Sequence, residues 1–240
     1  MTLQFVIEEA EKRRKSAVYY APEEGDLPAQ FDAQNVEMEY RDVPPGGPDP
    51  FVTIFDGGRF LGAVSVESLR TFLWPPIRRP YDATDLSPEY RALVELLDDT
   101  VFASLSRRQL LATTREFEDR AWRTGRGRLH VGFQSRSAFR AQRSLYRRMA
   151  AETDLDVHVY RAGDDGTDDD ASDDGVAESG LTLHVGSEAE FGRHWFVVFD
   201  GGGNDGPKNA LVAEQRTDET FYGVWTYDSG LVDRALAELA

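Results

Sequence analysis

The sequence contains no cysteine and little lysine, and its apolar runs are short. Without cysteine, disulfide bonds, thiolate catalysis and cysteine-ligated metal sites are excluded. No apolar run reaches the ~18 residues that a membrane-spanning helix needs. The stretch from Met1 to Glu9 has neither the basic region nor the small-residue cleavage site of a signal peptide. These absences predict a cytoplasmic chain without a membrane segment.

The sequence is also unbalanced in charge, because acidic residues outnumber basic ones. The chain has 43 acidic and 27 basic residues, a formal net charge of -16, and lysine only at Lys12, Lys15 and Lys208. This composition resembles that of haloarchaeal proteins from a high-salt cytoplasm, where salt screens charges over roughly 3 Å at 1 M. An acidic protein that binds basic partners is the alternative, but the acids are spread along the chain. The charge also argues against nucleic-acid binding, which uses a basic face.

The length of 240 residues suits one large domain or two modest ones, and 40% hydrophobic content supports a sizeable core. We expect an α/β (mixed α+β) fold, with a mixed sheet or two packed sheets covered by helices. A Pro-rich stretch at 74–87 is the clearest boundary. It divides the chain into an N-terminal half at 1–74, a connector with a helix at 75–99, and a second half at 100–240 with an acidic loop at 163–180.

Capping residues predict the longest helix, between Ser106 and Gly125. Serine is a good N-cap and glycine a good helix end, and an apolar stripe runs between them. Other helices are predicted at 2–15 with Thr2 as N-cap, 27–33, 66–73, 88–98, 137–152, 187–193 and 230–239. Strands are predicted at 17–20, 36–43, 51–56, 60–65, 129–133, 155–160, 181–185, 195–200, 210–216 and 221–227, and the segment 100–103 is ambiguous.

Two pairs of segments indicate an internal repeat. Residues 51–58 and 195–202 both run from an apolar strand into Phe-Asp-Gly-Gly, and residues 60–68 and 221–229 share Phe, Gly and Ser at matching positions. These matches occur in the same order and predict two related αβαββα halves, each with a parallel strand–helix–strand crossover. The alternative is that hairpins with glycine turns look alike.

Two features near glycines have an ordinary structural interpretation. Asp56 and Asp200 both follow a buried strand, where the carboxylate either faces a ligand or, as we favour, bonds the amides of a turn. The loop 201–209 is rich in glycine but lacks the Lys-Ser or Lys-Thr and the helix of a phosphate-binding loop. We therefore interpret it as a hairpin loop.

Three histidines, His130, His158 and His184, each lie within a predicted strand. They become neighbours if these strands pair, although their spacing in the sequence is not that of a metal site. For each histidine, a core or surface position is favoured over a role as ligand or base. We predict no metal site, no cofactor and no catalytic residue.

Functional residue types are densest on the long helix, at Glu116, Glu118, Asp119, Arg120 and Trp122. Arginine and tryptophan on one helix suit a pocket for an anion or small molecule, while an amphipathic helix with surface ion pairs is the favoured alternative. A pocket here would lie between this helix and the strand at 195–200. The candidate ligand-binding residues are Arg120, Trp122, His130, Trp195, Asp200 and Trp225.

Six segments together resemble the DICT sensory domain, named for diguanylate cyclases and two-component systems. They are REFEDRAWR at 115–123, RLHVGFQ at 128–134, LDVHVY at 155–160, WFVVFDGG at 195–202, ALVAE at 210–214 and FYGVWTYD at 221–228. The resemblance covers about residues 100–240, and the first half looks like a divergent copy or an extension.

The resemblance implies an intracellular α/β sensory domain of a kind commonly fused to signalling output modules. No cyclase, kinase or DNA-binding segment is evident in this sequence. The module would therefore detect a small molecule or a protein and act on a separate signalling protein or through a homodimer. We therefore predict a non-catalytic sensory or ligand-binding module. The alternatives are a protein–protein adaptor without a small ligand and, third, an enzyme that uses Asp200 with a histidine.

Overall fold

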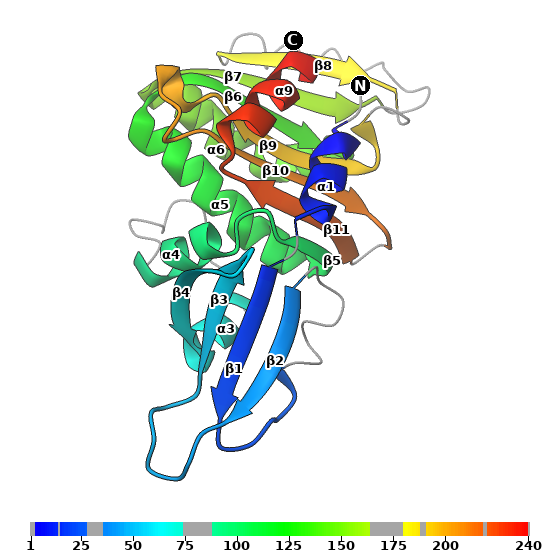
Figure 1. Cartoon of the computed structure of the whole chain (residues 1–240). Helices are drawn as coiled ribbons and strands as arrows, with labels where there is room; N and C mark the ends of the chain where they lie inside the picture. Colours follow the sequence, from blue (N-terminus) through cyan, green and yellow to red (C-terminus); the bar gives the residue numbers. More distant parts are fainter. Residues whose placement is uncertain are drawn as a thin grey trace.

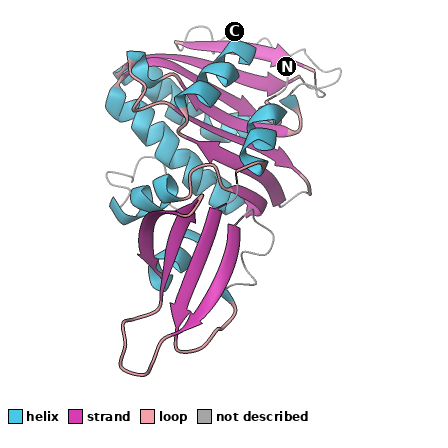
Figure 2. Cartoon of the chain, in the orientation of Figure 1, coloured by secondary structure: helices cyan, strands magenta, loops and turns pink. Residues whose placement is uncertain are grey.

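The computed structural model describes residues 3–13, 15–27, 36–73, 88–163, 180–187, 191–217 and 220–239. Their strands form two mixed sheets, with helices packed against them (Figures 1 and 2). The predicted mixed α/β fold class is thus confirmed. The predicted helix at 27–33 from residue 28 onward, the connector at 74–87, the acidic loop at 164–179 and residues 188–190 of the turn at 187–193 lie outside the described residues.

The small sheet has the order β2 (Val36–Asp42), β1 (Lys15–Ala21), β3 (Phe51–Asp56), β4 (Arg59–Ser65). The large sheet has the order β5 (Val101–Ser106), β11 (Thr220–Thr226), β10 (Asn209–Gln215), β9 (His194–Phe199), β6 (Arg126–Phe133), β7 (Asp154–Ala162), β8 (Leu181–Gly186). The described helices are α1 (Gln4–Glu11), α3 (Val66–Leu73), α4 (Pro88–Leu96), α5 (Arg107–Thr124), α6 (Arg136–Glu152) and α9 (Ser229–Leu239), with a 3-10 turn, η2, at Gly201–Gly203.

The two sheets share part of their strand order. β1 pairs with β2 and β6 with β7, both in parallel, as the predicted crossovers require. In each sheet the next strand, β3 or β9, is antiparallel to the first of these, and a further antiparallel strand, β4 or β10, follows. The strand order therefore matches β4 with β10. The sequence instead matches β4 with β11, which pairs with β10 and β5.

Both faces of the central strands of the large sheet are covered, so these strands are apolar on both sides. Helices α5 and α6 pack against one face, where Leu129, Val197 and Leu211 join the main core. Helices α1 and α9 pack against the other, where Val198 and Val212 lie in a second apolar cluster (Figure 1). Because successive strand residues point to opposite faces, these two clusters alternate along β9 and β10.

The caps of α5 form as predicted. The Ser106 hydroxyl accepts a hydrogen bond from the backbone N–H of Gln109, and the Gln109 side chain accepts one from the backbone N–H of Ser106. At the other end Gly125 adopts φ 68°, a left-handed conformation in which glycine has no steric cost. Local sequence thus sets both ends of this helix.

Helix α1 differs from the prediction. It begins at Gln4 with Leu3 at the N-cap position and no side-chain cap, and it ends at Glu11 rather than near residue 15; Thr2 lies outside the described residues. Its buried residues pack against the large sheet, although the strands that follow it form the small one. Residues 101–103 of the ambiguous segment belong to the edge strand β5.

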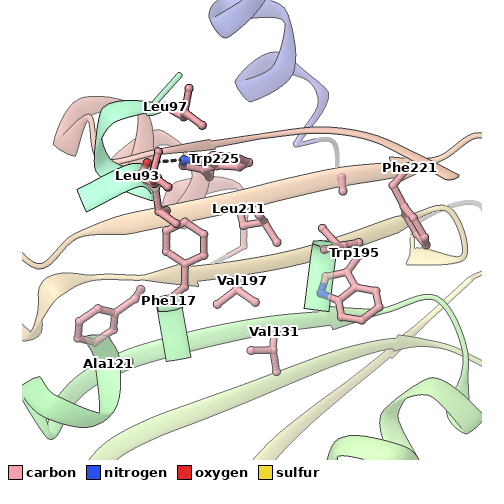
Figure 3. Packing of buried hydrophobic residues seen from close by; sticks show 14 of the residues in the cluster. Leu93, Leu97, Phe117, Ala121, Val131, Trp195, Val197, Leu211, Phe221 and Trp225 are labelled. Atoms are coloured by element: carbon pink, nitrogen blue, oxygen red, sulfur yellow. Dashed lines mark hydrogen bonds between the residues drawn. The ribbon is translucent and has the colours of Figure 1, made fainter. Parts of the chain in front are cut away.

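Helix α4 connects the cores of the two sheets. Its residues Leu93 and Val94 and the following Leu97 belong to the same apolar cluster as both sheets. The indole N–H of Trp225 on β11 donates to the carbonyl oxygen of Val94 at 2.8 Å (Figure 3). The small sheet is thereby attached to the large one through buried contacts.

The small sheet is covered less evenly. One face packs into the shared core, whereas the side chains of the other face are half-buried or exposed. The latter face carries two aromatic pairs, Tyr20 with Phe51 and Phe55 with Phe60, and Phe60 is 57% exposed. In the described part of the chain, no helix is both long and apolar enough to span a membrane.

Candidate functional site

The six predicted ligand-binding residues do not converge on one pocket. Trp195 and Trp225 are buried in the main core, and Arg120 and Trp122 lie on α5. His130 points to the opposite face of the large sheet, and Asp200 lies in the turn after β9. The interface between α5 and β9, where we expected the pocket, is filled by side chains with 0% exposure: Phe117, Ala121, Val197 and Phe199 (Figure 3 shows the first three).

Arg120 belongs to an ion-pair network between α4 and α5. Its Nη2 atom lies 2.7 Å from Glu95 and 3.5 Å from Glu116, and its guanidinium lies 4.4 Å from the centre of the Tyr227 ring. Glu116 is fully buried, and this burial raises the pKa of its carboxyl against the opposing effect of nearby arginines, including Arg91 at 3.5 Å. The expected i,i+4 pair between Glu116 and Arg120 is present within α5. Two further pairs, Arg120 with Glu95 and Arg91 with Glu116, connect α5 to α4.

Asp200 is a turn residue, as the favoured interpretation predicted. One carboxylate oxygen accepts the backbone N–H of Gly202 at 2.9 Å, and the other lies 3.2 Å from Nε of Arg128. An enzyme that uses Asp200 with a histidine would need these two side chains paired. In the structure the buried histidine nearby, His130, bonds a tyrosine instead.

A cluster of one tyrosine and three histidines lies on strands β6, β7 and β8, on the face that α9 covers in part. We call the four side chains of His130, His158, Tyr160 and His184 the His–Tyr cluster. Strand register brings them together, because His130 lies opposite His158 and Tyr160 lies opposite His184. The histidines thus become neighbours through strand pairing, as the sequence predicted on that condition.

The four rings of the His–Tyr cluster stack in two nearly parallel pairs. The His130 and His158 rings have centroids 4.6 Å apart at 11°, and the Tyr160 and His184 rings have centroids 4.3 Å apart at 7°. His158 and His184 bridge the pairs, with ring nitrogens 3.0 Å apart. This stacking fixes the ring planes, so the polar edges of the cluster are held in place.

Hydrogen bonds determine the tautomer of the buried histidine. The Tyr160 hydroxyl donates to the carbonyl oxygen of Leu239 at 2.9 Å, so it has no proton left to give to His130. It must accept from Nδ1–H of His130, 3.0 Å away. Nε2 of His130 is then a bare acceptor, and this atom is buried without a hydrogen-bond partner.

Burial also sets the charge state of this residue. His130 is 3% exposed, and burial, assisted by His158 and Arg128, lowers its pKa to about 4. It is therefore neutral near pH 7. Burial and the neighbouring His158 likewise lower the pKa of His184, which is only partly buried.

The cluster presents polar ring edges, and its geometry is not that of a metal centre. Its rings lie face to face, whereas metal ligands point their nitrogens at one common point. In the described ranges, no group of three or more His, Asp or Glu side chains is arranged to hold a metal ion. The Tyr160 partner and its bond to the end of α9 could not be found from sequence, because both depend on contacts between distant segments.

Comparison with protein families identifies the class of protein. Residues 90–216, just over half of the chain, match the family described as the sensory domain in diguanylate cyclases and two-component systems, DICT. The chain therefore belongs to the DICT family of sensory domains. The match begins within α4, earlier than the resemblance suggested, and ends before β11 and α9.

Other comparisons add little. No curated protein matches the chain. A solved structure of polyphosphate kinase from Porphyromonas gingivalis aligns over 98% of this chain and 48% of its own, at 9% identity and a TM-score of 0.35. The chain thus spans about half the length of that kinase. A likeness at this score bears on neither fold nor function.

Proposed function

We propose that this chain is a non-catalytic sensory module that binds a small molecule at the His–Tyr cluster and signals through a separate protein. Membership of a sensory family supports the sensory role. The observation that carries the choice of site is the buried, unpartnered Nε2 of His130, next to side chains that are partly open to solvent. Buried polar atoms in proteins nearly always have a partner, so an unpaired one calls for a ligand or water.

The cluster also has the composition of a ligand site. Small-molecule sites combine aromatic surface with a few fixed polar groups, which is what the stacked rings and their ring nitrogens provide. The bond from Tyr160 to Leu239 connects the cluster to the last turn of α9. A ligand that contacts Tyr160 would therefore contact a residue that is hydrogen-bonded to the C-terminal end of α9.

The test is native mass spectrometry of the full chain, followed by thermal-shift screening with neutral, cationic and anionic metabolites. We expect a ligand whose binding is lost in His184→Gln. Binding should persist in His194→Gln, which changes the one histidine outside the cluster. If wild-type protein retains no ligand and no compound shifts its melting temperature, the proposal is wrong.

A second candidate function is a protein–protein adaptor without a small ligand. The half-exposed face of the small sheet favours it, because Tyr20, Phe51, Phe55 and Phe60 form aromatic surface beside charged residues of β2. The same surface is available as a partner-binding site for the sensory module. The ligand screen distinguishes the two functions, because a sensory module should show a thermal shift with at least one metabolite and an adaptor should show none.

A further inference from the structure

We propose that the His158–His184 pair binds the anionic group of a small ligand, a carboxylate or phosphate, and takes up one proton as it does so. This inference rests on the proposed function and names the class of ligand for the same site. It follows from the direction of each hydrogen bond in the pair, from the ring stacked on His184, and from the charge of the surroundings.

The direction of the hydrogen bonds begins at Asp156. Its carboxylate is an acceptor and lies 3.0 Å from Nε2 of His158, so that nitrogen carries a proton. In neutral His158 the other nitrogen, Nδ1, is then a bare acceptor. It lies 3.0 Å from Nε2 of His184, which must donate to it. Neutral His184 therefore has its lone pair on Nδ1.

The His158–His184 pair can take up one additional proton without losing a hydrogen bond, but it cannot take up two. A proton added to Nδ1 of His184 breaks none of these bonds, because Nε2–H of His184 still donates to His158. A second proton, on Nδ1 of His158, would place two N–H groups against each other at 3.0 Å. The pair thus acquires a single positive charge, and it presents a new N–H donor on His184. No described contact occupies this nitrogen.

The neighbouring ring favours that charge. The Tyr160 ring lies parallel to the His184 ring with centroids 4.3 Å apart, and the electron-rich face of an aromatic ring attracts a cation. Within the described ranges, the charged groups that act on His130 and His184 are Asp156 on β7, Arg128 on β6 and Asp200 after β9. Arg128 pairs with Asp200, and Asp156 bonds Nε2 of His158, on the side of the pair away from His184. Nδ1 of His184 therefore has no described acidic partner, and the anionic group of a ligand can pair with it.

Proton uptake follows from the resting state of His184. Its pKa lies below the ordinary value because of burial and of His158, so it is mostly neutral near pH 7. An anion bound at Nδ1 raises this pKa, and the proton enters with the ligand. By linkage, anion affinity should increase as pH falls, by up to about tenfold per pH unit.

The experiment is isothermal titration calorimetry of the full chain with sodium acetate and, separately, inorganic phosphate, at one fixed potassium chloride concentration. Two buffers of different ionisation enthalpy give the number of protons taken up. We expect about one proton per anion bound at pH 7 and stronger binding at pH 6. The probe that binds distinguishes a carboxylate ligand from a phosphate ligand.

Three variants complete the design. His184→Gln should abolish proton uptake and the pH dependence, while His194→Gln should keep both. Should His184→Gln fold poorly by circular dichroism, His158→Phe replaces it, because phenylalanine keeps an aromatic ring at this position and removes the acceptor that orients His184. Nitrogen-detected imidazole NMR should show His130 protonated on Nδ1 and neutral His158 protonated on Nε2.

Failure of this inference can be told apart from failure of the proposed function. Anion binding without proton uptake, or binding retained in His184→Gln, would overturn the inference. So would a ligand screen in which only neutral or cationic compounds bind at the cluster, and in that case the sensory proposal stands. If no compound of any charge binds, both proposals are wrong.

Discussion

Replacing Trp225 by phenylalanine tests whether this residue is part of the core or of a ligand pocket. Its side chain is 0% exposed and is enclosed by the apolar cluster that joins both sheets. Its indole N–H is bonded to the carbonyl oxygen of Val94 at 2.8 Å. Phenylalanine removes the donor and leaves a cavity where the second ring was.

The cost can be worked out from these two losses. A buried carbonyl left without its donor costs about 1–3 kcal/mol. The smaller ring loses apolar burial and leaves a cavity, at about 1–2 kcal/mol more. We expect Trp225→Phe to lower the free energy of unfolding by about 3 kcal/mol, which for a chain of this size corresponds to about 6–12 °C in melting temperature.

The measurement is urea unfolding followed by far-UV circular dichroism, at a fixed salt concentration, with Trp122→Phe as the matched control. Trp122 is half-buried on α5, and the guanidinium of Arg148 lies 5.5 Å from the centre of its ring. This control should lose less than about 1 kcal/mol. If Trp225→Phe costs no more than the control but abolishes ligand binding, Trp225 lines a pocket and our assignment of it to the core is refuted.

Two further predictions concern buried acids. Burial and Asp99 raise the pKa of Asp98 from 3.8 to about 6, so ionisation of Asp98 destabilises the fold as pH rises from about 3.8 through about 6. Asp98→Asn keeps an acceptor for the backbone N–H of Tyr227 and removes the charge. Urea unfolding at several pH values should show that the free energy of unfolding of this variant exceeds that of the wild type by about 1–3 kcal/mol above pH 6 and equals it below pH 4. A gain that is the same at all pH values would contradict this. Tyr146→Phe removes the buried hydroxyl that donates to Glu118 and should lower the free energy of unfolding by about 2 kcal/mol in the same assay. In the control Tyr222→Phe, the lost hydroxyl bonds Glu11 at the surface, and the free energy of unfolding should fall by less than about 0.5 kcal/mol. Equal losses in the two variants would show that burial of the hydroxyl is not the cause.

The parts of the structure that sequence predicted are those that neighbouring residues determine. Ser106 and Gly125 define the ends of α5 through bonds that reach no further than four residues. Asp200 bonds an amide two residues away, in the turn that the sequence predicted. Such contacts depend on residue type and spacing alone, so a single sequence is enough to find them.

The parts that sequence missed depend on pairing between distant segments. Helix α1 precedes β1 but packs on the large sheet, in the same apolar cluster as α9. Its apolar stripe shows that one face is buried but does not show which sheet that face covers. The candidate pocket residues came from a helix, three strands and a turn, and nothing in the local sequence showed that Phe117 and Val197 would fill the space between α5 and β9. The His–Tyr cluster needed the register of three strands, and periodicity predicts strands without predicting register.

For the proposed sensory function, these long-range contacts offer a path from the His–Tyr cluster to the other end of α9. Helix α9 is bonded at its C-terminal end, where Leu239 accepts from Tyr160 of the His–Tyr cluster. At its N-terminal end Asp228 caps the helix and pairs with Arg13, which also bonds Asp99 in the turn between α4 and β5. Eleven residues of helix separate these contacts by about 16 Å. A single rigid element therefore links the proposed ligand site to the junction where the small sheet joins the large one, and a ligand that moves Tyr160 acts directly on that element.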